Sequence, residues 1–289
     1  MAIIIDETTK VLVQGMTGNQ GRFHTGQMLE FGTNIVAGVS AGKGGQEVHG
    51  LPVFNTVAEA LEKTEIDATI LFIPAPILKD FAFEAMENGI KNVVIITEHV
   101  PLHDAMEIMA YAKDNDVNVI GPNTFGLISP GKCKIGIMPN RIYKPGNIGI
   151  VARSGTLSYE IANGLTTNGI GQSTVVGLGG DRVVGLSFVD VLRQFEKDPD
   201  TEAVVLVGEI GGNAEEIASE YIKEMSKPVV ALLAGRSAPP GKRMGHAGAI
   251  IERGTGTYNG KVTALKAAGA IVATLPWEVP GLLKQALKK

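Results

Sequence analysis

The sequence alternates short apolar runs with turns rich in glycine or small polar residues along almost its whole length. Uninterrupted apolar runs of this kind are typical of strands buried on both faces of a parallel sheet. The stretches between them have helix-like patterns, and strand–helix alternation indicates an α/β fold. The predicted strands lie at 10–15, 34–39, 67–73, 92–96, 117–120, 147–152, within 171–182, within 203–212, at 228–234 and at 270–273.

The length and the glycine content fit two such units in one chain. The 289 residues suffice for about two domains, and the 37 glycines suit many tight strand-to-helix turns. We expect a Rossmann-like domain over residues 1–125. The segment 126–146 carries Ser-Pro-Gly and Pro-Gly turn signals and is predicted to be a linker or an extended segment. A second α/β unit is expected over 147–289.

Composition argues against several classes of function. The formal net charge is −4 and no basic stripe is present, so nucleic acid is not the expected partner. The single cysteine, Cys133, rules out an intramolecular disulfide and favours a reducing compartment, so a cytoplasmic protein is expected. The N-terminus lacks the pattern of a signal peptide, and no apolar stretch reaches membrane-spanning length, so no membrane association is expected.

A glycine turn directly follows the first predicted strand. Gly15, Gly18 and Gly21 stand at every third position and let the backbone approach a ligand at a helix N-terminus. The spacing G-x-x-G-x-x-G differs from the dinucleotide pattern, and such motifs are weak alone, so a plain strand-to-helix turn is the alternative.

The end of the second predicted strand carries a lysine where a nicotinamide-binding domain would carry an acidic residue for the ribose. Lys43 stands in a glycine loop at this position. A lysine there favours a ligand with an extra phosphate, such as the 3′-phospho-ADP part of coenzyme A. A solvated loop lysine is the alternative.

The second unit opens with a possible anion site. Ser154 or Thr156 follows a predicted strand and can cap the next helix, which leaves N-terminal amides for an anion. A plain capped helix explains the same residues equally well. Ser154 lacks a Gly-x-Ser-x-Gly context and has no local histidine partner, and no cluster of residues has metal-ligand spacing.

His246 stands between small residues, after a run at 236–244 that is rich in proline, glycine and positive charge. A nucleophilic imidazole on such a loop is a candidate acceptor for a phosphoryl group. Glu209 ends a predicted strand at the level where this loop could arrive, and a carboxylate that accepts an imidazole N–H makes it a better nucleophile. A loop histidine of no special role and a solvated glutamate are the alternatives.

Together these stretches resemble one family, the α subunits of succinyl-CoA synthetases (succinate–CoA ligases), which are nucleoside-diphosphate-forming acyl-CoA synthetases. The likeness covers essentially the whole chain. The resemblance implies an N-terminal Rossmann-like CoA-binding domain followed by a flavodoxin-like, doubly wound ligase domain. The matching stretches are 14–21, 42–45, 50–57, 154–157, 208–212 and 241–250, of which the last is highly specific.

The resemblance also implies roles for individual residues. By this likeness His246 is transiently phosphorylated, Glu209 is its carboxylate partner, and Tyr159 matches the acyl-substrate position. The helix that begins after the strand at 147–152 would hold the phosphate through Ser154, Gly155 and Thr156. The residues that match CoA contacts are Thr17, Gly18, Asn19, Gln20, Lys43, Ile96, Thr97 and Glu98.

The chemistry implied is a phosphoryl relay among an acyl-CoA, a histidine and a nucleoside diphosphate. The chain contains no ATP-grasp domain, so a separate β subunit is expected to hold ATP or GTP with Mg²⁺. The family resemblance implies an αβ or α2β2 assembly and a small dicarboxylate substrate.

Two positions depart from the pattern expected for succinate. Thr124-Phe125 stands where Cys-Pro is expected, and Arg182 stands where Pro is expected. Asp181-Arg182 resembles ATP-citrate lyase, and an added guanidinium near the acyl site could pair a further carboxylate, so Arg182 is a candidate for acid selectivity. We expect succinate as the acid, with malate or citrate as alternatives. A non-catalytic CoA-binding protein and an NAD-dependent oxidoreductase are the competing functions.

Overall fold

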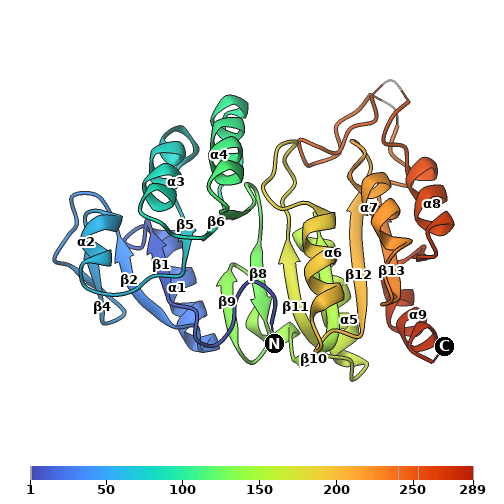
Figure 1. Ribbon diagram of the computed structural model, residues 1–289, viewed down its shortest axis with the longest axis horizontal. Helices are drawn as coiled ribbons and strands as arrows, with labels where there is room; N and C mark the ends of the chain where they lie inside the picture. Colours follow the sequence, from blue (N-terminus) through green and yellow to red (C-terminus); the bar gives the residue numbers. More distant parts are fainter. Residues whose placement is uncertain (1, 240, 253, 289) are drawn as a thin grey trace. The chain divides into compact units, whose positions relative to one another are not determined.

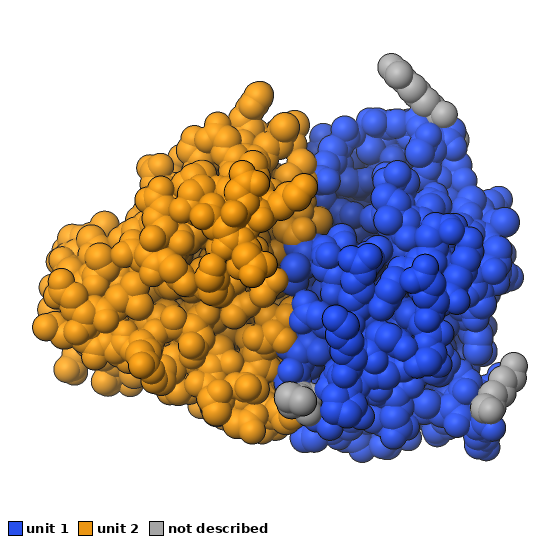
Figure 2. All heavy atoms as spheres, viewed as in Figure 1, with its two compact units in different colours: residues 1–3, 141–182, 186–289 blue, residues 4–140, 183–185 orange. Residues whose placement is uncertain are grey.

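The computed structural model describes residues 2–239, 241–252 and 254–288 and separates into two compact units (Figure 2). The N-terminal unit, orange in Figure 2, comprises residues 4–140 and 183–185. The C-terminal unit, blue, is built mainly from residues 141–182 and 186–289. Each unit alternates strands with helices, as the sequence predicts (Figure 1).

The N-terminal unit has the strand order of a Rossmann fold. Its sheet runs β3-β4-β2-β1-β5-β6-β7, and every pair is parallel except β3 with β4. The order reverses between β1 and β5, which is where such sheets bind ligands. The elements are β1 (Val11–Gln14), α1 (Asn19–Phe31), β2 (Ile35–Val39), β3 (Glu47–Val48), β4 (Leu51–Phe54), α2 (Val57–Leu61), β5 (Ala68–Leu71), η1 (Ala75–Ile77), α3 (Leu78–Glu87), β6 (Asn92–Ile95), α4 (Leu102–Asp114), β7 (Asn118–Ile120), β8 (Gly126–Ser129) and β9 (Cys133–Gly136).

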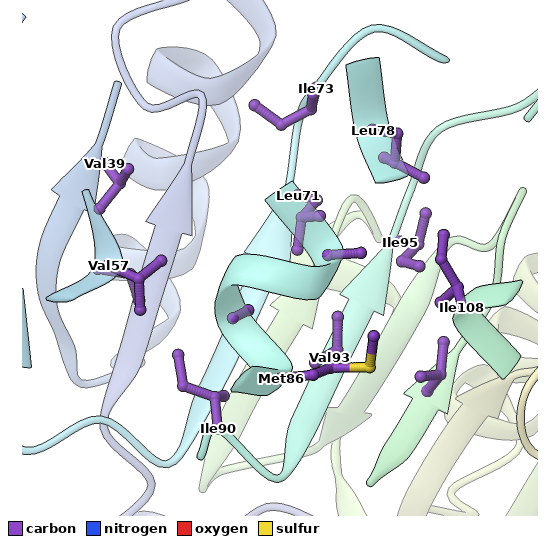
Figure 3. Packing of buried hydrophobic residues seen from close by; sticks show 14 of the residues in the cluster. Val39, Val57, Leu71, Ile73, Leu78, Met86, Ile90, Val93, Ile95 and Ile108 are labelled. Atoms are coloured by element: carbon purple, nitrogen blue, oxygen red, sulfur yellow. The ribbon is translucent and has the colours of Figure 1, made fainter. Parts of the chain in front are cut away.

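The core of this unit lies between its sheet and three helices. Leu71 of β5 and Ile95 of β6 pack with Leu78 and Met86 of α3 and with Ile108 of α4 (Figure 3). Val57 of α2 belongs to the same buried cluster. The aliphatic composition therefore builds the expected sheet core almost without aromatic residues.

The C-terminal unit has a flavodoxin-like strand order. Its parallel strands run β14-β13-β12-β10-β11, so the first strand of the unit is central and the order reverses between β10 and β12. The elements are β10 (Pro145–Ala152), α5 (Gly155–Thr167), β11 (Gln172–Gly177), α6 (Phe188–Lys197), β12 (Ala203–Glu209), α7 (Ala214–Ile222), β13 (Val229–Ala234), α8 (Tyr258–Ala267), β14 (Ile271–Ala273), η3 (Pro276–Glu278) and α9 (Val279–Ala286), and the short η2 (Asn140–Ile142) precedes β10.

The α6 helix shows how local sequence fixes these elements. Ser187 caps it in a capping box with Asp190, which satisfies donors at the helix start. Its buried residues recur at helical spacing from Phe188 to Phe195 and form one apolar face. Gly149 of β10 makes room for this face, because a Cβ there would lie 2.7 Å from the Phe195 ring.

The segment 126–146, predicted to be a linker or an extended segment, forms a β-hairpin in its first half. Residues 126–129 and 133–136 form the antiparallel hairpin β8–β9, and all eight are buried. Gly126 has a φ of +95°, and a Cβ there would lie 2.1 Å from the carbonyl oxygen of Ile135. The Ser-Pro-Gly signal thus marks a hairpin turn, and the boundary between the compact units follows residue 140.

None of the helices in the described part of the chain is long and apolar enough to cross a membrane.

Candidate active site

The C-terminal unit gathers its functional residues at the carboxyl edge of its sheet. β10 and β12 are neighbours, but the helices that follow them pack differently: α5 contacts α9, whereas α7 contacts α6 and α8. This switch point is where an open α/β sheet leaves a crevice for ligands. Arg153 directly follows β10, and Glu209 is the last residue of β12.

His246 lies against Glu209 at this edge. Its Nδ1 atom is 2.7 Å from Oε2 of Glu209. The carboxylate is buried, whereas 29% of the His246 side chain is exposed. The pair therefore commits Nδ1 to Glu209 and leaves Nε2 as the nitrogen that can react with a ligand.

A guanidinium holds the other side of the same carboxylate. Arg153 Nε lies 3.1 Å from Glu209 Oε1, as an ion pair without hydrogen-bond geometry. Arg153 Nη2 donates to the carbonyl oxygen of Asp181 at 2.5 Å. Glu209 is thus fixed between a cation and the imidazole, and its orientation is set by both.

The pKa of His246 is raised above its ordinary value. The hydrogen bond to Glu209 is the largest cause, and burial acts in the opposite direction. The Glu209 and Asp181 charges raise the pKa further, while the Arg153 charge lowers it. A carboxylate that holds the Nδ1 proton stabilises the positive charge that an imidazole acquires when Nε2 forms a bond.

Glycines shape the space around the imidazole. A Cβ at Gly180 would lie 2.5 Å from Cγ of His246, so only glycine lets the ring sit against this turn. The N–H of Gly248 donates to the carbonyl oxygen of Gly180 at 3.1 Å, which fastens the histidine loop to the same turn.

Arg182 meets the histidine loop. Its Nε donates to the carbonyl oxygen of Ala247 at 3.3 Å, and its Nη2 lies 2.8 Å from Oε1 of Glu252. Both members of this ion pair are about half exposed. Arg182 also lines a hollow of about 1160 Å³ together with Arg153 and Glu252.

The predicted phosphate helix, α5, begins where the sequence indicates. Ser154 is its N-cap, and its hydroxyl accepts from the N–H of Leu157 at 3.4 Å. Gly155 and Thr156 are the first two residues of the helix. Tyr159 lies one turn further along, and burial raises the pKa of its phenol to about 12, so the hydroxyl stays protonated.

The predicted CoA residues lie in the N-terminal unit. Gly18 precedes α1, which begins at Asn19 and continues through Gln20, and all three are exposed. The N–H of Thr17 donates to Oγ of Ser40 at 3.3 Å, which ties the glycine turn to the end of β2. Gly21 allows a close turn, because a Cβ there would lie 2.1 Å from the carbonyl oxygen of Gly15.

The remaining predicted CoA residues follow β2 and β6. Lys43 is exposed in the turn after β2. Ile96, Thr97 and Glu98 follow β6, and the Thr97 hydroxyl donates to the carbonyl oxygen of Ile73 at 2.6 Å. These residues line the carboxyl ends of the strands, which is the edge where α/β sheets bind ligands.

Known proteins resemble the chain over both units. The family model of the CoA-binding domain matches residues 6–99, and the family model of the CoA-ligase matches residues 151–271. Succinate–CoA ligase (ADP-forming) subunit alpha 2 of Archaeoglobus fulgidus is 58% identical over 287 residues, which cover 99% of this chain and 100% of that protein. The subunit alpha of Methanothermobacter thermautotrophicus is 61% identical, over 95% of this chain and 93% of that protein.

The chain belongs to the family of succinate–CoA ligase α subunits. This confirms the family, the two-domain α/β fold and the ligase class predicted from the sequence. A solved structure is also similar: ATP citrate lyase from Methanothrix soehngenii, in complex with citrate and coenzyme A, has a TM-score of 0.90 and 28% identity. The match covers 99% of this chain and 50% of that chain, so this chain spans about half of the length of the lyase.

Several residues around His246 were not identified from the sequence. Arg153 lies beside a predicted anion site, but its contact with Glu209 depends on which strands are neighbours. Glu215 and Lys261 stand on helices, where charged residues are ordinarily solvated, and only packing reveals that both are buried. Among the described residues, no group of three or more His, Cys, Asp and Glu side chains could hold a metal ion.

Proposed function

We propose that this chain is the catalytic α subunit of a nucleoside-diphosphate-forming succinate–CoA ligase in which His246 carries the phosphoryl group. The observation that carries this proposal is the 2.7 Å contact between Nδ1 of His246 and the buried carboxylate of Glu209. A binding protein without catalysis has no need of a buried carboxylate that activates a partly exposed imidazole.

The reaction proceeds by two transfers before the nucleotide takes part. Inorganic phosphate attacks the thioester carbonyl of succinyl-CoA, and the C–S bond breaks to give succinyl phosphate and CoA. Nε2 of His246 then attacks the phosphorus, the bond from phosphorus to the carboxyl oxygen breaks, and succinate leaves. The phosphoryl group finally passes from Nε2 to a nucleoside diphosphate. In reverse, the same steps make the thioester.

Glu209 and Arg153 have different electrostatic roles in this proposal. Glu209 holds the Nδ1 proton, so the lone pair of Nε2 is directed at phosphorus and the ring charge is compensated. Arg153 holds the carboxylate in place through its second oxygen. The N-terminus of α5, with Ser154, Gly155 and Thr156, is suited to the phosphate oxygens, and Tyr159 lies on the same helix as a donor for the acyl group.

The N-terminal unit binds CoA at its own switch point in this proposal. The amides that follow the glycine turn, Thr17–Gln20, would meet phosphate oxygens, and Lys43 would pair with a phosphate. The family model of a CoA-binding domain over residues 6–99 supports this assignment. Residues 96–98 would contact the same ligand.

A β subunit with an ATP-grasp domain completes the enzyme in this proposal. It would hold ATP or GTP with Mg²⁺, and the assembly would be αβ or α2β2 in the cytoplasm. The relatives support a partner because they are named as α subunits, and their names specify the ADP-forming reaction.

Citrate is the second candidate acid, with malate behind it. Arg182 and the 28% likeness to ATP citrate lyase favour it, whereas the relatives at 58% and 61% identity are named for succinate. Comparing kcat/KM for the three acids with one αβ preparation decides between them, and we expect succinate to be preferred.

The test of the function uses the full chain with a candidate β subunit, Mg²⁺ and γ-labelled ATP. We expect label on the α chain that is lost in acid and kept in base, and that is discharged by succinate and CoA together. Label that is stable in acid, or no label while the complex makes succinyl-CoA, contradicts the proposal.

A further inference from the structure

A buried lysine lies beneath the site and belongs to none of the motifs. Lys261 of α8 is fully buried, and its ammonium group contacts the carboxylate of Glu215, whose residue is 1% exposed. A second carboxylate, Glu216, lies 3.5 Å from the same nitrogen. Taking an ammonium group and its carboxylate partner out of water is costly, so such a pair needs further hydrogen bonds to hold it.

The pair is bonded to the main chain of Glu209. Oε1 of Glu215 accepts the N–H of Glu209 at 3.0 Å, while its other oxygen faces Lys261. Gly208 leaves room for this carboxylate, since a Cβ there would lie 2.6 Å from Glu215 Oε1. The residue that orients His246 is therefore itself held by a buried carboxylate.

Lys261 holds a second point of the same loop. Its Nζ donates to the carbonyl oxygen of Gly211 at 2.7 Å. Gly211 has a φ of +93°, and a Cβ there would lie 2.1 Å from the carbonyl oxygen of Gly248 in the histidine loop. The backbone after Glu209 thus forms a surface against which the histidine loop packs.

We propose that Lys261, acting through Glu215 and Gly211, is a positioning residue for the Glu209–His246 pair. The inference rests on the proposed function of His246. Lys261 touches no reacting atom of the proposed transfer. It fixes the backbone at Glu209 and Gly211. The Glu209 carboxylate is thereby held within reach of Nδ1 of His246, and the histidine loop is held in one position against the backbone of Gly211. A displacement of about 1 Å in such a pair is enough to cost roughly a hundredfold in rate.

The experiment compares Lys261→Met with Lys266→Met, which changes an exposed lysine on the same helix. In the full chain, NMR titration gives the pKa of His246, which responds to the charges of Glu209, Arg153 and Asp181 around it. Thermal unfolding gives Tm. With a β subunit added, rapid mixing gives the initial rate of phosphohistidine formation.

We expect Lys261→Met to lower the pKa of His246 toward its ordinary value and to slow phosphorylation by about ten- to hundredfold. Lys266→Met should leave both unchanged. The pair Lys261→Met/Glu215→Gln removes both buried charges together and should keep the fold better, yet show the same drop in the pKa of His246.

A merely structural lysine would lower Tm while the pKa of His246 and the phosphorylation rate stay within twofold of the Lys266→Met control, and that result overturns the proposal. If the single variant does not fold, the same two outcomes are read from the double variant, and failure of both to fold counts against a positioning role. The pKa readout needs no partner subunit, so it separates this proposal from a failure of the phosphoryl relay.

Discussion

Both units have a topological switch point at the carboxyl ends of their strands, but the residues at the two switch points differ in exposure and charge. At the N-terminal switch point, between β1 and β5, the loops present exposed backbone and an exposed Lys43. At the C-terminal switch point, between β10 and β12, Glu209 is 5% exposed and meets Arg153 and His246. The same topology therefore carries exposed loops in one unit and fixed, partly desolvated charges in the other.

This difference follows from what each task requires. A large phosphorylated ligand brings its own charge and can be held by backbone amides at a helix start and by an exposed cation. Transfer of a phosphoryl group requires a nucleophile whose orientation and charge are set before the ligand arrives. The fold provides a switch point in both units. The burial of charged side chains distinguishes the switch point suited to phosphoryl transfer from the one suited to ligand binding.

The largest expected effect comes from His246→Asn. Net ligation and phosphorylation should fall to background because the proposed nucleophile is gone. CoA affinity should stay within about twofold, since the residues proposed to contact CoA lie in the other unit. Coupled assay of succinyl-CoA formation and calorimetry with CoA measure the two. Turnover that persists in a clean preparation of His246→Asn would contradict the assignment of phosphoryl transfer to the C-terminal unit.

Glu209→Gln should slow phosphorylation by about 10²- to 10³-fold, as loss of one fixed electrostatic partner does. In the wild type the raised pKa keeps His246 protonated, and unreactive at Nε2, to higher pH; the rate should therefore rise as pH increases through a midpoint above 6.5. In Glu209→Gln the midpoint should move to lower pH. A pH–rate profile with an unchanged midpoint would mean that Glu209 does not set the imidazole charge.

Gly180→Ala should slow phosphorylation by about tenfold or more, because the new Cβ would lie 2.5 Å from Cγ of His246 and the ring must shift. Gly164→Ala is the matched control in α5, where the nearest atom would be 3.9 Å away, and it should leave the rate unchanged while adding about 0.5–1 kcal/mol of stability. Equal rates in the two variants would show that the ring tolerates displacement.

The smallest effect is expected in the N-terminal unit. Lys43→Met should weaken CoA binding by about two- to fivefold, which is the size of a solvated ion pair, and the loss should shrink at high salt. Dephospho-CoA provides the comparison, because it lacks the 3′-phosphate. A loss of CoA affinity that is independent of salt would mean that Lys43 makes a buried contact with CoA. The contrast between exposed residues in the N-terminal unit and buried charges in the C-terminal unit would then be weaker.

The sequence predicts the fold better than the site because strands leave a local signal and side-chain contacts do not. Every predicted strand is found, since each apolar run is long enough to identify alone. The hairpin β8–β9 and the pair β3–β4 were missed because their Pro and Gly residues resemble loops, and only pairing makes them strands. Glu209 and His246 meet as the motif suggests, but the roles of Arg153, Glu215 and Lys261 depend on contacts between elements far apart in sequence.

The proposed phosphoryl relay depends most directly on which nitrogen of His246 takes the phosphoryl group. Phosphorylate the full chain with its β subunit, ATP and Mg²⁺, and record ¹H–¹⁵N and ³¹P NMR spectra of the denatured product in base, where phosphohistidine survives. Because Glu209 engages Nδ1 at 2.7 Å, we predict phosphorylation at Nε2 of His246 and at no other histidine. A phosphoryl group on Nδ1, or on another residue, contradicts the account.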